Sequence, residues 1–161
     1  MDADTEIALA RPSDALALAE MSRDLIEVGL GWSWKPSRIL AMIEHSESVV
    51  LMARTRLEIA GFAIMEFHEE HAHLNLLAVK PHQQRKGLGK ALLEWLAVSA
   101  RLAGIARIEL EVRTDNDEAI NFYQSIDFRR DKVLKGYYQR KQDALRMVHH
   151  LMTPEMAAQR P

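Results

Sequence analysis

The chain has 161 residues, of which 48% are hydrophobic and 27% charged, a composition typical of one soluble globular domain. It contains no cysteine, which excludes thiol catalysis, disulfide scaffolds and zinc ribbons and suits a reducing compartment. The acidic start of the chain does not resemble a signal peptide, and no apolar run approaches the ~20 residues of a membrane span. We therefore expect a cytoplasmic protein without a membrane partner.

The formal net charge of −2 is unevenly distributed along the chain. Residues 1–70 carry 6 Lys and Arg against 13 Asp and Glu, whereas residues 71–161 carry 15 against 10. This asymmetry indicates that the C-terminal half handles an anion, while the N-terminal half tolerates or attracts a cation.

The first half of the chain predicts a strand, two helices and then a meander of strands. A strand at residues 5–10 precedes a helix that runs through Val28 and is stopped by Gly29 and Gly31. A second helix starts at Ser37. Alternating or apolar stretches then predict antiparallel strands at 49–54, 59–68 and 73–79.

The second half alternates helices and strands. It predicts helices at 87–103 and 115–126 and strands at 105–113, 128–134 and 144–151. The expected fold class is therefore α/β, with a mixed, mostly antiparallel sheet flanked by helices on both faces. We expect one domain over residues 1–161, with a frayed tail at 154–161.

A glycine-bearing turn follows the apolar strand that ends at Val79 and opens the next helix. The first amides of a helix lack internal partners and carry the positive end of its dipole, so they bind anions. Gly87 and Gly89 let a ligand approach the backbone. Three basic side chains, which favour a pyrophosphate over a carboxylate, surround these amides: Arg85, Lys86 and Lys90.

Two better-known phosphate loops do not match this turn. A dinucleotide fingerprint requires a third glycine where the chain has Leu92. A nucleoside-triphosphate loop requires glycine at Gln84 and Ser or Thr at Ala91. We therefore expect neither NAD nor ATP as the ligand.

The segment Gln84-Arg85-Lys86-Gly87-Leu88-Gly89 matches the Gln/Arg-x-x-Gly-x-Gly/Ala signature of the GNAT acetyltransferase superfamily. Downstream segments resemble later blocks of that superfamily: Leu110-Glu111-Val112-Arg113, Asn116, Ala119, Phe122-Tyr123, Phe128 and Gly136-Tyr137-Tyr138. In this spacing the chain is most similar to the ribosomal-protein-alanine N-acetyltransferase branch, over residues 74–151. Residues 1–70 match only in the order of elements.

The resemblance implies a GNAT-like single N-acetyltransferase domain that uses acetyl-CoA as co-substrate and no metal. It implies Glu111 as the general base and Tyr123 as the acid that protonates the leaving thiolate. The implied cofactor-binding residues are Leu77, Ala78, Val79, Gln84, Arg85, Lys86, Gly87, Leu88, Gly89, Lys90, Asn116 and Tyr123. Asp127 stands where the family usually has glycine, and we expect a strained left-handed turn there.

The residues themselves leave alternatives open at both catalytic positions. Glu111 shares a strand face with Glu109 and two arginines, and this face is either a solvated surface or part of a site. In a site, the neighbouring carboxylate would raise the pKa of Glu111, whereas the arginines would lower it. Tyr123 has the helical spacing of an ordinary core tyrosine with a solvated hydroxyl.

Two further groups invite functional interpretations. His68, His71 and His73 suggest a metal, but their spacing differs from that of a zinc helix, and we expect solvated turn residues. Trp32 and Trp34 are either core anchors or walls of an acceptor pocket.

The leading hypothesis is acetyl transfer to a primary amine by direct attack, with the α-amine of a protein or peptide as the expected acceptor. An α-amine is neutral at pH 7 about 10% of the time and a lysine ~0.04%, so the α-amine is easier to use. The alternatives are a small-molecule amine acetyltransferase and a non-catalytic acyl-CoA-binding sensor. The expected partner is thus a small-molecule amine or a protein N-terminus, not a nucleic acid, and a homodimer is one oligomeric state left open.

Overall fold

The computed structural model describes residues 4–152, which divide into two compact units. The first unit contains residues 4–66 and 74–96, and the second contains residues 67–73 and 97–152. The frayed tail predicted at 154–161 lies outside the described residues. Within residues 4–152, no helix combines the length and the apolar character needed to cross a bilayer.

The first unit contains strands and helices in the order that the sequence predicts. Its elements are β1 (Glu6–Leu9), α1 (Ala15–Leu25), α2 (Pro36–Glu44), β2 (Ser48–Arg54), β3 (Ile59–Phe67), the end of β4 (His71–Val79) and the start of α3 (Leu88–Leu102). Short 3-10 helices lie at Pro12–Asp14 and Pro81–Gln83. β1 pairs with β2, and β2 with β3, in antiparallel register.

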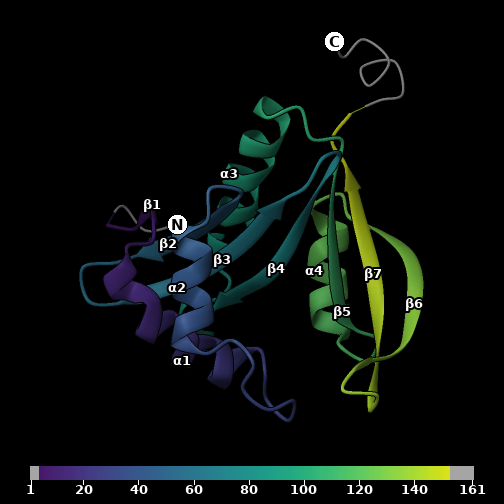
Figure 1. The fold of residues 1–161 in the computed structure, drawn as a ribbon, viewed down its shortest axis with the longest axis horizontal. Helices are drawn as coiled ribbons and strands as arrows, with labels where there is room; N and C mark the ends of the chain where they lie inside the picture. The colour runs from purple at the N-terminus through teal and green to yellow at the C-terminus, as the bar shows by residue number, and fades with distance from the viewer. Residues whose placement is uncertain (1–3, 153–161) are drawn as a thin grey trace. The chain divides into compact units, whose positions relative to one another are not determined.

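The core of the first unit lies between the sheet and helices α1 and α2, which cover one face of β2 and β3 (Figure 1). Leu18 of α1, Ile39 of α2 and Phe62 of β3 are fully buried in it. β3 has six consecutive buried residues, which requires cover on both of its faces because successive strand residues point in opposite directions. The continuous apolar sequence of β3 thus has a direct structural reason.

Helix α1 ends at Leu25, three residues earlier than the prediction of a helix through Val28. The Ser22 carbonyl accepts hydrogen bonds from the amides of both Ile26 (3.0 Å) and Glu27 (2.9 Å), so the last turn widens before the glycines are reached. Gly29 and Gly31 then adopt left-handed φ angles of 78° and 79° in the following loop. The helix is ended by this local hydrogen bonding, and the glycines turn the chain afterwards.

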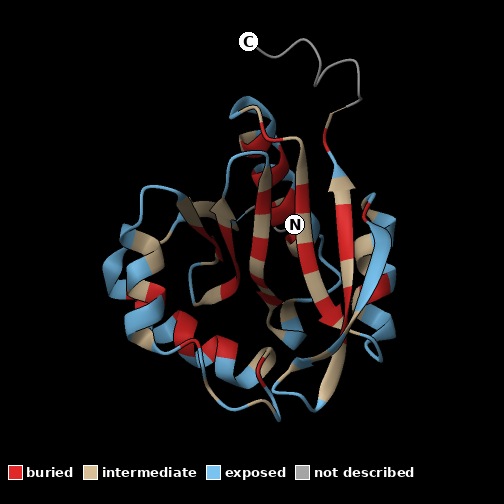
Figure 2. Ribbon diagram, turned by 45° about the vertical axis from the view of Figure 1, so that its right-hand side comes forward, coloured by how far each residue is buried: buried red, intermediate tan, exposed pale blue. Residues whose placement is uncertain are grey.

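The second unit is built on β5 (Arg107–Arg113). The start of β4 pairs with β5 in parallel, β7 (Gln142–His150) is antiparallel to β5, and β6 (Arg129–Tyr138) is antiparallel to β7. Helix α4 (Asp117–Ser125) follows β5. Burial alternates along β5, so Glu109 and Glu111 point to the face opposite Ile108 and Leu110, as predicted; Figure 2 shows this kind of alternation as red and tan bands along strands.

The strands of the described residues are hydrogen-bonded in the order β1-β2-β3-β4-β5-β7-β6. The β4–β5 pair is parallel, whereas the β1–β2, β2–β3, β5–β7 and β6–β7 pairs are antiparallel. The expected α/β class with a mixed, mostly antiparallel sheet and flanking helices is therefore confirmed.

Candidate functional site

The predicted anion-binding turn lies in the first unit, between β4 and α3. Its backbone turns through left-handed φ angles of 65° at Arg85 and 80° at Gly87. A Cβ atom added at Gly87 would meet no atom within 4 Å, so the backbone there faces open space. The Ala91 amide donates to the Gly87 carbonyl (2.9 Å) in the first hydrogen bond of the helix. The amides of residues 88–90 therefore precede the hydrogen bonds within the helix and have no helical acceptor.

The side chains predicted around this turn have different surroundings. Arg85 and Lys86 are exposed, and Lys90 lies 3.9 Å from Glu94 in a solvent-exposed pair. Ala78 and Leu88 are buried, so these two positions offer a ligand only their backbone. The Gln84 amide Nε2 donates to the Val79 carbonyl (3.1 Å) and thereby ties the turn to the end of β4.

A carboxylate that the sequence did not single out holds the segment before the turn. Glu58 accepts hydrogen bonds from Gln83 Nε2 (3.0 Å), His82 Nε2 (2.5 Å) and Lys80 Nζ (3.0 Å). These donors lower the pKa of Glu58 to about 2. The position was missed because Glu58 is more than 20 residues away from its partners along the chain.

The second unit contains a cluster of polar side chains around Glu111. Its Oε1 lies 2.6 Å from His73 Nε2 and accepts a hydrogen bond from the Tyr137 hydroxyl (3.0 Å), while its Oε2 accepts one from Arg146 Nε (3.2 Å). The Glu111 side chain is only 4% exposed, compared with 25% for His73. The cluster thus combines a buried carboxylate with a more accessible imidazole.

The sequence left the direction of the Glu111 pKa open, and the structure gives it as lowered. Burial favours the neutral acid and would raise this pKa, but hydrogen bonds from His73, Tyr137 and Arg146, together with the charge of His73, outweigh it. In turn, burial and the Glu111 charge raise the pKa of Tyr137 to about 12. Glu111 is therefore a carboxylate at neutral pH.

Tyr123, on α4, packs its ring edge-to-face against Phe122 (5.2 Å between centroids) and Phe128 (5.5 Å). Burial, and secondarily the neighbouring Tyr138, raise the pKa of Tyr123, so its hydroxyl keeps its proton. The packing of Tyr123 as a core residue is therefore compatible with its expected role as the acid that protonates the leaving thiolate. At the end of α4, Asp127 has a left-handed φ of 74°, as predicted.

Asn116 caps the N-terminus of α4, where its Oδ1 accepts the Ala119 amide (3.1 Å). This capping role was not predicted from the sequence. The cap is consistent with the sequence, since Asn is among the preferred N-cap residues.

The interpretation of His71 and His73 as solvated turn residues is wrong. β4 begins at His71, two residues earlier than predicted, so both histidines lie in the strand and face the charged side of β5. His71 lies 3.7 Å from Glu109, and His73 contacts Glu111. Among residues 4–152, no group of three His, Asp or Glu side chains is arranged to hold a metal ion.

The two tryptophans both attach to the core of the first unit. Trp34 is buried there, which supports the core-anchor alternative. Trp32 is partly buried and donates its Nε1 proton to the Ala19 carbonyl (3.0 Å). The Lys35 ammonium lies over the ring of Trp32, 4.4 Å from its centroid.

Comparisons with known proteins agree with the sequence motifs. The model of the acetyltransferase (GNAT) family matches residues 18–128. The chain is 32% identical over 148 residues to the N-alpha-acetyltransferase RimI of Mycobacterium tuberculosis, covering 86% of this chain and 89% of the relative. It is 41% identical over 81 residues to the ribosomal protein bS18-alanine N-acetyltransferase of Escherichia coli K12, an alignment that spans half of this chain and 55% of that protein.

The crystal structure of the Escherichia coli ribosomal-protein-S18-alanine N-acetyltransferase matches with a TM-score of 0.80 and 27% identity, over 94% of this chain and 97% of that one. This likeness covers more of the chain than the sequence motifs do, since over residues 1–70 the motifs gave only the order of elements. The chain belongs to the acetyltransferase (GNAT) family.

Proposed function

We propose that the protein transfers the acetyl group of acetyl-CoA to the α-amine of a protein or peptide. The observation that carries this proposal is the turn between β4 and α3, where free helical amides and an open Gly87 adjoin exposed basic side chains. The relatives named as α-amine and alanine N-acetyltransferases support the choice of acceptor. We treat residues 1–161 as one acetyltransferase domain located in the cytoplasm, which the absence of cysteine suits.

The chemistry of the turn fits the coenzyme. Amides at a helix N-terminus stabilise the pyrophosphate, and Arg85, Lys86 and Lys90 add positive charge. The backbone of residues 77–79 at the end of β4 would bind the pantetheine arm, with the Val79 amide as an oxyanion donor. Bound acetyl-CoA supplies an activated thioester.

Glu111 and His73 together would take the proton that the acceptor amine loses. A carboxylate with a lowered pKa holds a proton poorly, whereas an imidazole is a better proton acceptor near neutral pH. Glu111 would orient His73 through their 2.6 Å contact and stabilise its charged form. Tyr123, which keeps its proton, would donate to the leaving thiolate as the sequence motif implies.

The proposal is tested by measuring free thiol released from acetyl-CoA. We expect release with a peptide that has a free N-terminal alanine and much less with the same peptide blocked at its N-terminus. Equal release with free amino acids or polyamines would favour a small-molecule acetyltransferase. Coenzyme A binding without any thiol release across both sets of amines would favour a sensor and would overturn the enzyme.

A variant of the turn tests the cofactor site separately. Gly87→Val should weaken coenzyme A binding more than tenfold, or about 1.4 kcal/mol, because valine resists a left-handed φ and would project into the ligand's approach. Calorimetry measures this affinity. Gly29→Val is the matched control, since Gly29 has a similar φ of 78° and equally open surroundings but lies after α1.

A further inference from the structure

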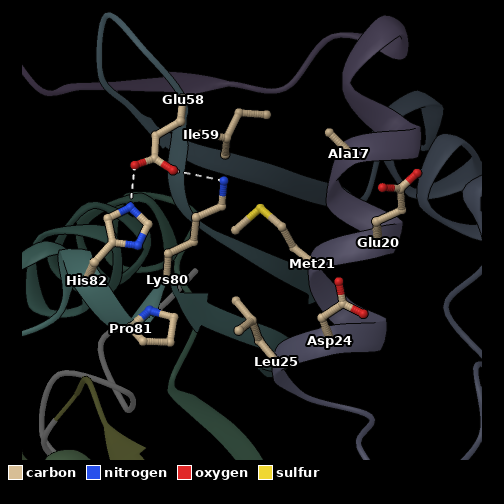
Figure 3. Close-up of a pocket in the computed structure, with 10 residues that line it drawn as sticks. All are labelled: Ala17, Glu20, Met21, Asp24, Leu25, Glu58, Ile59, Lys80, Pro81 and His82. Atoms are coloured by element: carbon tan, nitrogen blue, oxygen red, sulfur yellow. Dashed lines mark hydrogen bonds and ion pairs between the residues drawn. The ribbon is translucent and has the colours of Figure 1, made fainter.

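A pocket of about 460 Å³ in the first unit is lined by none of the residues to which the proposed acetyl transfer assigns a role. It lies between α1, the start of β3 and the segment that follows β4 (Figure 3). Its volume is in the range of pockets that bind small molecules. The residues that line the pocket indicate which class of ligand it can bind.

One wall of the pocket is an apolar stripe on α1. Ala17, Met21 and Leu25 are spaced by four residues, which places them on one side of the helix, and Ile59 and Pro81 face them across the hollow (Figure 3). A methionine side chain adapts its shape to different apolar ligands. These walls suit an apolar body of moderate size.

Two of the three carboxylates that line the pocket have a hydrogen-bonded basic partner. Asp24 is paired with Arg23 (2.8 Å), and Glu58 with Lys80 (3.0 Å). The third, Glu20, lies one helical turn before Asp24 and interacts with Arg23 only through its charge, since it accepts no hydrogen bond from the described residues. Three carboxylates against one lysine beside an apolar wall complement a cation, as the acidic balance of residues 1–70 also suggests.

We propose that this pocket binds a small organic amine with an apolar body. The ammonium group pairs with Glu20, and the apolar body lies against Met21, Leu25 and Ile59. The proposal does not depend on acetyl transfer, because it concerns binding to the first unit in the absence of acetyl-CoA.

The test uses 2-phenylethylamine as the probe and 2-phenylethanol, which has the same size without the charge, as its counterpart. Titration is followed through the methyl resonance of Met21 in the whole protein. We expect millimolar binding of the amine, as is usual for a ligand of this size, and clearly weaker binding of the alcohol. Equal affinity for both compounds, or no shift of the Met21 resonance, would overturn the proposal.

Two variants localise the site. Ala17→Leu should weaken the amine more than about tenfold by filling the hollow, and leucine keeps the helical propensity of this exposed position. Glu20→Gln should weaken it about threefold, the size expected for an exposed ion pair. The matched controls on α2 are Ala41→Leu and Glu44→Gln, both at exposed positions outside the pocket. Unchanged binding in Ala17→Leu and Glu20→Gln, with unchanged melting temperatures, contradicts the proposal.

Discussion

At the scale of single residues, Glu111 illustrates how neighbours decide the chemistry of a carboxylate. Its burial alone favours the neutral acid, yet donors from three other strands keep it ionised. Charge-assisted hydrogen bonds of this kind are stronger than neutral ones, and here they outweigh the desolvation. A carboxylate with a lowered pKa is a weaker base, and this is why the proposed reaction uses Glu111 as the partner of His73.

Replacement of Glu111 by glutamine should lower the acetylation rate more at pH 7 than at pH 9. An α-amine is mostly neutral at pH 9 and no longer needs a proton acceptor, whereas at pH 7 most of it is protonated. A lysine acceptor would stay mostly protonated at pH 9, so the recovery would then be much smaller. The pH profile of kcat/KM with an N-terminal peptide measures this difference.

Glu109→Gln is the control for that experiment. Glu109 lies on the same face of β5 but has other ionic partners: it forms an ion pair with Arg107 (2.9 Å) and lies 3.7 Å from His71. We expect its pH profile to follow that of the unaltered protein. If the two variants have the same profile, Glu111 is only the polar side of a strand.

Tyr123→Phe should reduce turnover about 10²-fold while leaving coenzyme A affinity nearly unchanged. The substitution removes only the hydroxyl and keeps the ring packed against Phe122 and Phe128. A smaller loss is compatible with a thiol of pKa near 8.5, which is already a fair leaving group. Single-turnover rates and calorimetry separate the two effects, and full activity would return Tyr123 to a packing role alone.

The sequence predicted which face of β5 carries Glu111 but not what surrounds it. The alternation of β5 is a local signal, and period-two patterns can be read without a structure. His73, Tyr137 and Arg146 come from β4, β6 and β7, at separations of 26 to 38 residues. Their convergence depends on strand order and register, such as the pairing of Glu111 with Arg146, which no local pattern contains.

At the scale of elements, the connection between α1 and α2 is organised by one buried carboxylate. Glu27 accepts hydrogen bonds from the Ser22 hydroxyl (2.9 Å), from the amide (2.8 Å) and hydroxyl (2.6 Å) of Ser33, and from the amide of Trp34 (3.3 Å). Burial would raise its pKa, but these donors lower it. Periodicity could not reveal this connection, which explains why the predicted end of α1 was wrong.

Replacement of Glu27 by alanine should destabilise the protein by about 3 kcal/mol, because it leaves buried donors without an acceptor. Denaturant unfolding measures the change, and Glu20→Ala, an exposed acidic residue of α1, is the control with little effect. Since the folded pKa of Glu27 is lowered, its contribution is present above the unfolded value of about 4.5 and is lost as the pH falls through the folded value. The difference in stability between parent and variant should therefore narrow in acid; a constant difference would contradict this role.

Gly61 on β3 controls how closely β3 approaches the end of β4. A Cβ atom there would lie 2.9 Å from the Ala78 carbonyl oxygen and 3.2 Å from Val79 Cγ2. Gly61→Ala should thus displace the backbone at Val79, cost about 2 kcal/mol of stability and weaken coenzyme A binding. Thermal unfolding and calorimetry check both effects. If both the stability and the coenzyme A affinity stay unaltered, the close approach of β3 to the end of β4 is not needed for folding or for coenzyme A binding.

At the scale of the whole molecule, the near-neutral net charge conceals two oppositely charged halves of the chain. The basic half contains the turn proposed for an anionic cofactor, and the acidic half supplies the carboxylates of the pocket proposed for an amine. The distribution of charged residues along the sequence is sufficient to predict this division. Only the structure shows which charges remain available to a ligand, because some of them, such as Glu58 and Lys80, form ion pairs between the two halves of the sequence.

Coenzyme A binding should therefore weaken with ionic strength even though the protein as a whole carries a net negative charge. Between about 0.05 M and 0.5 M salt, screening shortens the range of exposed charges to a few ångströms, and we expect the Kd to rise severalfold. Arg85→Ala should both weaken binding and flatten this salt dependence, because Arg85 is an exposed charge of the turn itself. Arg56→Ala removes the same charge from an exposed position between β2 and β3. It should change the Kd slightly at every salt concentration without changing the salt dependence. Equal flattening by both variants would mean that the coenzyme responds to the net charge of the molecule and not to the turn.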